Sequence, residues 1–393
     1  MSKKKTETIL SRDEPKERNI HSHIAPLYLS STYIYPSVDE AQEVFKGKKK
    51  AHIYGRWSHP NAELAEEKLE AMQAKKNTKA LLFSSGMAAI AAVFQALIKP
   101  GDKILVQGNI YGTTIDYLNH FSAQTGFENV YADLKNLNEV EALFKKHKFK
   151  VLYCETPSNP TIACYDLEKL SNIAHKHGAK VVVDNTFATP LLQQPLHLGA
   201  DFEIDSSTKF LNGHGTGISG AVIGADKNFM EKDMWKIRKL NGSIISPMDA
   251  WLLNLGMKTL SVRMEKHCSN AMKVAEYLSK HKAVKSVNYL GLKSHPDHKL
   301  ALKQMCGFGG VLSFELKDGY KAAKKLMGRV KLCHLTASLG TTDTLIQHPA
   351  SMSHYFVPKK QRDAFGITDG LVRLSVGLEN AEDIIEDLGK AMG

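Results

Sequence analysis

Val181-Val-Val-Asp184-Asn-Thr186 is a short apolar run that ends on a carboxylate, as a buried strand does. Similar runs stand at 80–83, 104–106, 151–154 and 221–223, and helix-like stretches lie between several of them. Strands that alternate with helices predict an α/β fold with a mostly parallel sheet flanked by helices. Ligands of such sheets bind beyond the carboxyl ends of the strands, which is where Asp184 stands.

The chain divides into three regions along its 393 residues, and this length favours more than one domain. Residues 1–60 are polar and rich in turns, and we expect an arm that lies on a neighbouring subunit. Residues 61–245 carry the alternating pattern of the large domain. Residues 246–393 predict a smaller C-terminal α/β domain that begins with one or two long helices, over 249–278, and ends on an amphipathic helix at 381–392.

Bulk composition excludes several classes of protein. Hydrophobic residues make up 43% of the chain, no apolar run is long enough to cross a membrane, and no secretory signal follows the basic N-terminus. We therefore expect a cytoplasmic enzyme. Five scattered cysteines argue against a disulfide framework and a zinc site. The net charge of +11 comes from dispersed basic residues, which favours attraction of anionic small molecules over nucleic-acid binding.

The run Asp205-Ser-Ser-Thr-Lys209 surrounds an amine with hydroxyl groups. A lysine that forms a Schiff base needs apolar or cationic surroundings, and the ring nitrogen of pyridoxal 5'-phosphate (PLP) needs an anionic partner. Lys209 alone could be a surface residue and Asp184 alone a capping residue, but the pair predicts PLP as the cofactor. Ser206 and Thr208 could add hydroxyl donors to its phosphate.

Three further positions carry both a functional and a structural interpretation. Phe83-Ser-Ser-Gly86-Met87 joins a strand to an Ala-rich helix, whose N-terminus could bind a phosphate or could be a simple capped turn. Tyr111 follows an apolar strand and could stack on a flat heterocycle or pack in the core. Arg373 lies inside the apolar strand 371–376 and must pair with a carboxylate of a ligand or of the protein.

Together these segments resemble the Cys/Met metabolism (trans-sulfuration) family of PLP-dependent enzymes, which includes methionine γ-lyase, cystathionine γ-lyase, cystathionine γ-synthase and the O-acylhomoserine sulfhydrylases. The resemblance extends from about residue 20 to the end of the chain. It is carried by Tyr54-Gly-Arg56, Ser85-Gly-Met87, Glu155-Thr-Pro-Ser-Asn159-Pro-Thr161, Asp184-Asn-Thr186, Ser206-Ser-Thr208-Lys209, Ser338-Leu-Gly340, His348-Pro-Ala-Ser-Met352 and Arg373-Leu-Ser-Val-Gly377.

The resemblance implies fold type I of the PLP-dependent transferases, as in aspartate aminotransferase, and a homotetramer built from active dimers. It implies that Lys209 holds PLP as an aldimine and then moves protons, and that Asp184 pairs with the pyridine nitrogen. Tyr111 would stack on the ring and assist the leaving group. The other cofactor-binding residues would be Thr186, Gly86, Met87, Ser206, Thr208 and, toward the neighbouring subunit, Tyr54 and Arg56. The substrate carboxylate would be bound by Asn159, Ser338 and Arg373.

Two positions bear on the substrate, an amino acid that the resemblance leaves open. Ala337 stands where the cystathionine enzymes usually carry Glu, and Thr113 stands where methionine γ-lyases usually carry Cys. We expect γ-elimination at a carbon–sulfur bond of a methionine-like or cystathionine-like substrate, with γ-replacement on an O-acylhomoserine as the alternative. A non-catalytic homologue that serves as a binding module is disfavoured, because Lys209, Asp184 and Arg373 are all present.

Overall fold

The computed structural model describes residues 5–13 and 22–393, so the parts of the predicted arm at 1–4 and 14–21 lie outside the described residues. Within the described ranges the larger sheet has seven strands. Their order is β1 (Lys79–Phe83), β7 (Gly220–Gly224), β6 (Phe202–Asp205), β5 (Lys180–Asp184), β4 (Phe149–Glu155), β2 (Lys103–Gln107) and β3 (Glu128–Ala132). Neighbouring strands are parallel except at β7, which runs antiparallel to β1 and β6, so the predicted mostly parallel sheet is confirmed.

Both faces of this sheet are apolar and covered by helices, because successive strand residues point to opposite sides. On β5, Val181 and Val183 belong to one buried cluster and Val182 to the other. The first cluster includes residues of α3 (Pro60–Gln73), α6 (Leu137–Lys146), α7 (Leu167–Lys176) and α11 (Pro247–Met257). The second includes residues of α4 (Gly86–Leu97), α5 (Gly112–Thr125) and the helical run α9 (Lys227–Phe229), η2 (Met230–Met234) and α10 (Trp235–Asn241).

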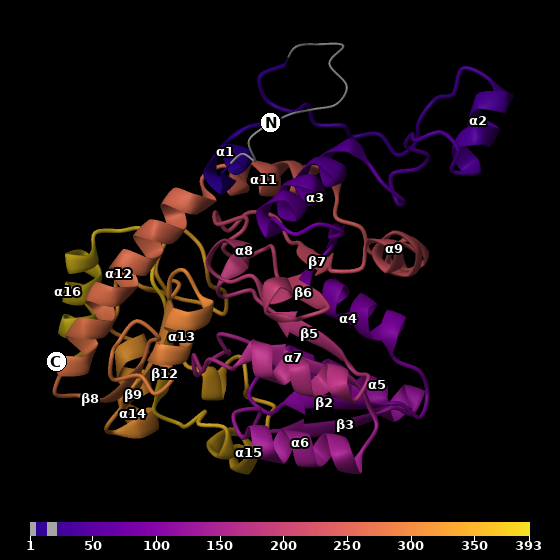
Figure 1. Ribbon diagram of the computed structural model, residues 1–393. Coiled ribbons are helices and arrows are strands. Elements are labelled where there is room, and N and C mark those ends of the chain that lie inside the picture. Colours follow the sequence, from indigo (N-terminus) through magenta and orange to yellow (C-terminus); the bar gives the residue numbers. More distant parts are fainter. Residues whose placement is uncertain (1–4, 14–21) are drawn as a thin grey trace.

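A second sheet forms most of the C-terminal region, which lies beside the larger sheet in Figure 1. Its order is β10 (His334–Leu335), β11 (Leu345–Gln347), β12 (Leu371–Ser375), β9 (Val311–Leu316) and β8 (Val284–Asn288), and only β10 and β11 are parallel. It packs against α12 (Leu260–Lys280), α14 (Gly319–Met327) and α16 (Ala381–Met392). The predicted helical stretch 249–278 therefore belongs to two helices, α11 and α12.

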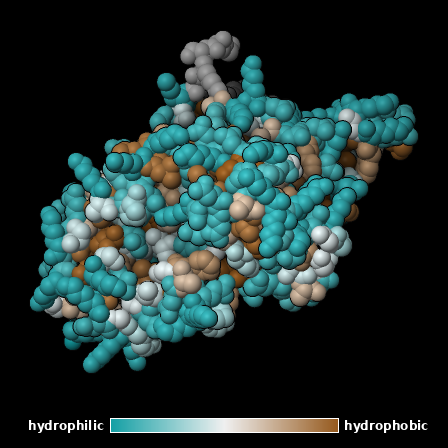
Figure 2. Space-filling view, turned by 60° about the horizontal axis from the view of Figure 1, so that its bottom comes forward, coloured by the Kyte–Doolittle hydropathy of each residue, from teal (hydrophilic) through white to brown (hydrophobic). Residues whose placement is uncertain are grey.

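Short elements complete the fold: α8 (Thr189–Leu192), η1 (Pro195–Leu198), α13 (His298–Gln304), η3 (Pro349–Ser351) and α15 (Lys359–Ala364). No helix in the described part of the chain is long and apolar enough to cross a membrane. Figure 2 shows a mostly hydrophilic face on which hydrophobic residues form separate patches.

The N-terminal region contributes two short helices, α1 (Thr6–Ser11) and α2 (Val38–Phe45). α1 packs on α3 through the buried Leu10, and α2 projects from the body of the molecule (Figure 1). Apolar side chains around α2 are open to solvent, since Ile34 is 97% exposed and Val38 85% exposed. A single chain therefore leaves much of this segment uncovered.

Candidate active site

A cavity of about 290 Å³ opens at the carboxyl ends of β4, β5 and β6. This is the edge at which a parallel α/β sheet is expected to bind its ligand. The cavity brings together most of the residues singled out by sequence: Gly86, Met87, Tyr111, Asn159, Asp184, Thr186, Ser206, Thr208, Lys209 and Arg373. Segments that are far apart along the chain therefore meet around one space, as the sequence predicted.

Lys209 lies in the turn that follows β6 and reaches the cavity with its amine. Its Nζ donates a hydrogen bond to Ser338 Oγ at 2.9 Å. Burial, and to a lesser degree the charge of Arg373, lowers the pKa of Lys209 from 10.5 to about 8. An amine with such a pKa is a better nucleophile near neutral pH than an ordinary surface lysine.

Asp184 ends β5 and is buried at the cavity wall. Its Oδ1 accepts hydrogen bonds from the Thr186 backbone N–H at 3.0 Å and from the Thr186 hydroxyl at 2.6 Å. The Tyr153 hydroxyl lies 3.4 Å from Oδ2. Burial raises the pKa of Asp184, whereas the hydrogen bonds from Thr186 and Tyr153 lower it. A cationic group bound in the cavity would offset the cost of burying this carboxylate.

The N-terminus of α4 faces the same cavity. Ser85 caps the helix by accepting a hydrogen bond from the Ala88 N–H at 3.0 Å. A Cβ on Gly86 would lie only 2.9 Å from Ser206 Oγ, so glycine is what lets the helix start so close to the turn that carries Lys209. The free amides of a helix start and the neighbouring Ser206 together suit an anion.

Thr208 lines the cavity, but its hydroxyl is occupied within the loop. It donates to the Ser219 carbonyl at 3.0 Å and accepts from the Ser219 N–H at 2.9 Å. The predicted donation from Thr208 to a phosphate would require this hydrogen to leave the Ser219 carbonyl. The second hydroxyl of the pair, on Ser206, lies on the side nearer to Gly86.

Arg373 is buried in β12, with 3% of its surface exposed. Its Nη1 donates to Asn159 Oδ1 at 3.0 Å and its Nη2 donates to the Ser338 carbonyl at 2.7 Å. Burial lowers the pKa of Arg373 to about 10, while Tyr111 and Glu155 act in the opposite direction. Among the described residues no carboxylate lies within salt-bridge distance of it, which leaves the guanidinium available to a ligand carboxylate.

Further residues of the cavity wall are aromatic or aliphatic. Tyr111 directly precedes α5 and is 36% exposed, so it stands at the wall and not in the core. Ala337, Phe187 and Ile218 also line the space. Thr113 lies in the first turn of α5 and is not among the described residues that line the cavity.

Tyr54 and Arg56 are not among the described residues that line this cavity, and they interact with each other. The Arg56 guanidinium carbon is 5.6 Å from the Tyr54 ring centroid, and Arg56 Nη1 donates to the Lys239 carbonyl at 2.5 Å. Tyr54 is 43% exposed. One chain therefore does not bring these two predicted cofactor-binding residues to its own site.

Comparisons with known proteins identify the family of the chain. A family model described as "Cys/Met metabolism PLP-dependent enzyme" matches residues 5–393. The chain belongs to this family. An L-methionine γ-lyase of Fusobacterium nucleatum subsp. polymorphum is 44% identical over 378 residues, covering 95% of this chain and 95% of the relative. A cystathionine β-lyase of Lactococcus lactis subsp. cremoris is 40% identical over 367 residues, covering 93% of each.

A solved structure gives the same result for the fold. The crystal structure of cystathionine γ-synthase from Xanthomonas oryzae pv. oryzae matches this chain with a TM-score of 0.92 and 34% sequence identity, covering 99% of this chain and 98% of that one. Fold type I is thereby confirmed. The chain is thus an enzyme of the PLP-dependent carbon–sulfur lyase group, in sulfur amino-acid metabolism.

The residues present fit PLP, the cofactor of the family. The fit rests on three features of this cavity: a lysine of lowered pKa, a buried carboxylate on the adjacent strand, and a helix start that only glycine can bring so close. They match the aldehyde, the pyridine nitrogen and the phosphate of PLP respectively. Because the lysine, the carboxylate and the helix start surround one cavity, a single PLP molecule could contact all three.

Sequence reasoning assigned no role to Glu155, a polar residue of the cavity. It ends β4 as Asp184 ends β5, and the two are register partners in the sheet. It is 4% exposed and its side chain accepts hydrogen bonds from the backbone of Tyr111 and Asn159. The signal was available, because a carboxylate closes the apolar run 151–154 just as one closes 181–183.

Proposed function

We propose that this enzyme binds PLP on Lys209 and catalyses γ-elimination at the carbon–sulfur bond of a methionine-like amino acid. The convergence of Lys209, Asp184 and Arg373 on one cavity supports this most strongly. The relatives named L-methionine γ-lyase, which are 44% identical to the chain, support the choice of substrate. The products would be an oxo acid, ammonia and a thiol.

The cofactor would be held by groups at three corners of the cavity. Lys209 would form the covalent bond, Asp184 would keep a proton on the pyridine nitrogen, and Thr186 would orient Asp184 through its two hydrogen bonds. The phosphate would lie at the start of α4, near Gly86, Met87, Ser206 and Thr208. Tyr111 would stack on the ring.

PLP supplies an electron sink that acidifies the protons on the α-carbon and β-carbon of a bound amino acid. The protein must place those protons within reach of a base. The Lys209 amine, with a pKa of about 8, can accept and return a proton near neutral pH. The Tyr111 hydroxyl can assist the departing sulfur. Ser338, which accepts from Lys209 Nζ at 2.9 Å, helps to orient that amine.

Substrate orientation would rest on Arg373 and Asn159. The guanidinium is fixed by its hydrogen bonds to Asn159 Oδ1 and the Ser338 carbonyl, so it meets a carboxylate in one geometry. Beyond that point the wall at Ala337, Phe187 and Ile218 carries no charge. It suits a thioether and offers no partner to a second ammonium group, which favours methionine over cystathionine.

The test is a direct assay of the purified protein. Supplied with PLP and L-methionine, it is expected to release a volatile thiol and an oxo acid in equal amounts. Lys209→Ala is expected to abolish this release. Lys232→Ala, which removes an exposed lysine from η2, is the matched control and is expected to retain it. A Lys209→Ala protein that still released thiol would contradict the assignment.

The second candidate function is γ-replacement on an O-acylhomoserine. The structural match to a cystathionine γ-synthase, with a TM-score of 0.92, supports this second candidate. The same preparation is therefore given O-acetylhomoserine and sulfide. Formation of homocysteine by a protein that leaves methionine intact would replace γ-elimination as the function.

We also infer an oligomer in which the N-terminal region contacts a neighbouring subunit. Tyr54 and Arg56 are not among the described residues that line their own cavity, which supports this, as do the exposed apolar side chains of Ile34 and Val38. The two residues would reach the phosphate bound by the neighbour, in a homotetramer of two active dimers. Light scattering of the purified protein is expected to give four times the mass of the chain, and the mass of one chain would contradict the inference.

A further inference from the structure

Glu155 occupies a central position between the two segments that face the substrate. Its Oε2 accepts a hydrogen bond from the Tyr111 N–H at 2.8 Å, and its Oε1 accepts one from the Asn159 N–H at 2.5 Å. Its own backbone N–H donates to Gln107 Oε1 at 2.9 Å, which fixes the end of β4 beside β2. One carboxyl group thus joins the start of α5 to the loop after β4.

The second link leads from Asn159 to the guanidinium. Asn159 Oδ1 accepts from Arg373 Nη1 at 3.0 Å, so the position of Asn159 sets one of the hydrogen bonds that orient Arg373. A shift of the Asn159 backbone would therefore be passed to the guanidinium. A shift of the Tyr111 backbone would move the aromatic ring at the cavity wall.

Burying the Glu155 carboxyl group at this position lowers the stability of the fold. Burial, and then the neighbouring Asp184, raises the pKa of Glu155, while the two backbone N–H groups and the charge of Arg373 act against this. In the described part of the chain Glu155 forms no salt bridge of its own. A buried carboxyl group without a direct cationic partner is costly, and such groups are concentrated at functional sites.

We propose that Glu155 is a positioning residue for substrate binding, which holds Tyr111 and the Asn159–Arg373 pair in the geometry that accepts the carboxylate of the amino acid. The proposal rests on the assignment of Arg373 to that carboxylate. It differs from a purely structural role, in which Glu155 would only satisfy two backbone amides at the end of a strand.

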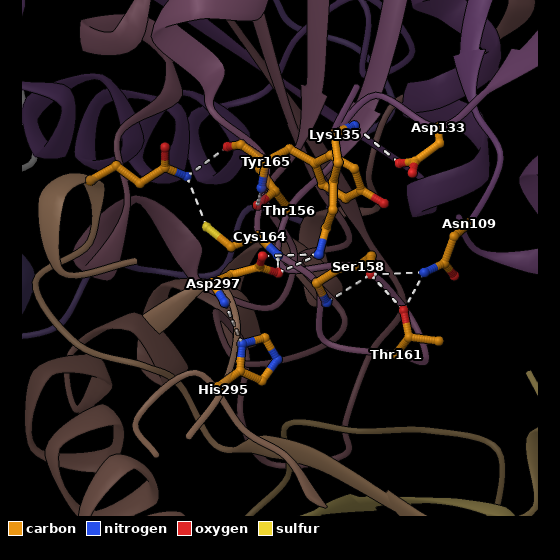
Figure 3. A network of polar contacts seen from close by, with 12 residues as sticks. Asn109, Asp133, Lys135, Thr156, Ser158, Thr161, Cys164, Tyr165, His295 and Asp297 are labelled. Carbon is orange, nitrogen blue, oxygen red and sulfur yellow. Dashed lines mark hydrogen bonds and ion pairs between the residues drawn. The ribbon is translucent and has the colours of Figure 1, made fainter. Parts of the chain in front are cut away.

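Other contacts anchor the loop after β4 independently of Glu155, as Figure 3 shows. Ser158 Oγ accepts from Asn109 Nδ2 at 3.2 Å, and Asp297 Oδ2 accepts from the Cys164 N–H at 3.0 Å. Asp297 is in turn held by Lys135 Nζ at 2.7 Å. A substitution at Glu155 is therefore expected to shift Asn159 locally and to leave the loop as a whole in place.

The experiment compares two ligands that carry no cleavable bond, so its result does not depend on whether methionine is the true substrate. L-norleucine has the amino and carboxylate groups of methionine, and n-pentylamine has the same chain without the carboxylate. Both are titrated into the PLP-loaded protein, and binding is followed by the change in visible absorbance and by calorimetry. The ratio of the two affinities isolates the carboxylate contact.

Glu155→Gln keeps the shape of the side chain but turns one acceptor into a donor that faces a backbone N–H. It is expected to weaken L-norleucine binding by about 10- to 100-fold, the usual range for leaving one buried backbone N–H without an acceptor. Binding of n-pentylamine is expected to change by less than about threefold. Glu155→Asp keeps a carboxyl group but reaches only one of the two amides, so an intermediate loss of L-norleucine binding is expected. This variant tests the proposal if the Gln protein does not fold.

Glu203→Gln is the matched control. Glu203 is also fully buried on a strand of the large sheet, and its oxygens accept from Gln73 Nε2 at 2.7 Å and Asn185 Nδ2 at 2.8 Å, outside the cavity. It is expected to lower the thermal midpoint without changing the ratio of the two affinities. Three results would overturn the proposal: unchanged L-norleucine binding in the Glu155 variants, equal weakening of both ligands, or the same loss of L-norleucine binding in Glu203→Gln.

Discussion

The lowered pKa of Lys209 leads to a quantitative prediction about how the protein takes up PLP. Only the neutral amine attacks an aldehyde, so the rate of covalent attachment depends on the fraction of Lys209 that is deprotonated. With a pKa of about 8 this fraction is about 10% at pH 7, whereas an ordinary lysine at 10.5 would give about 0.03%. The buried cavity therefore provides about 300 times more reactive amine at neutral pH.

The assay mixes cofactor-free protein with PLP between about pH 6 and pH 11.5 and follows the visible absorbance of the attached cofactor. Attachment is expected to accelerate as the pH rises, with a midpoint near pH 8, and to level off above about pH 9, where most of Lys209 is neutral. The α-acetyl amide of lysine, measured in parallel, reports the ionisation of PLP itself and is the reference. The ratio of the two rates, corrected for the neutral fraction of the reference amine, isolates the ionisation of Lys209.

Arg373→Met tests the cause of the shift. Burial is the larger cause and the charge of Arg373 the smaller, so removal of that charge is expected to move the midpoint upward by only part of the difference from 10.5. A rate that follows the lysine reference, with a midpoint near 10.5, would refute the argument that burial prepares the amine. A midpoint in Arg373→Met that reached the reference would show that burial is not the main cause.

Three more outcomes follow from the structure. Arg373→Lys keeps the charge but loses the two-pronged contact, so the KM for the amino acid is expected to rise by about 10- to 100-fold with a smaller change in kcat; a loss confined to kcat would contradict the assignment. Ala337→Glu is expected to shift the ratio of kcat/KM values from methionine toward cystathionine, and an unchanged ratio would exclude this wall from specificity. Asp13→Ala removes the carboxylate that lies 3.0 Å from the buried Lys68, so urea denaturation should show a loss of about 3 kcal/mol in the free energy of unfolding; no loss would contradict the pairing.

The sequence predicted those parts of the fold whose apolar pattern is regular. The runs at 181–183 and 371–375 lie in β5 and β12, and the amphipathic helix at 381–392 is α16. Two strands of the large sheet were missed. β6 (Phe202–Asp205) alternates apolar residues with two buried carboxylates, and β3 (Glu128–Ala132) is an edge strand with polar residues, so neither resembles a continuous apolar run.

The candidate site was predictable where a residue type carries an unusual chemical demand. A lysine among hydroxyl groups, a carboxylate at a strand end and an arginine inside an apolar strand each require a partner, and the cavity holds all three. Glu155 closes an apolar run as Asp184 does, but its two partners, the backbone N–H groups of Tyr111 and Asn159, appear only in the folded chain. The hydroxyl of Thr208 was assigned to a phosphate for a similar reason, since its bonds to Ser219 appear only in the folded loop.

The covalent bond between PLP and Lys209 is the central claim, and one measurement tests it most directly. The purified protein is reduced with borohydride, digested and mapped by mass spectrometry. We expect a pyridoxyl-phosphate mass on the peptide that contains Lys209 and on no other lysine. A modified peptide elsewhere in the chain, or none at all in protein shown to bind PLP, would contradict the account.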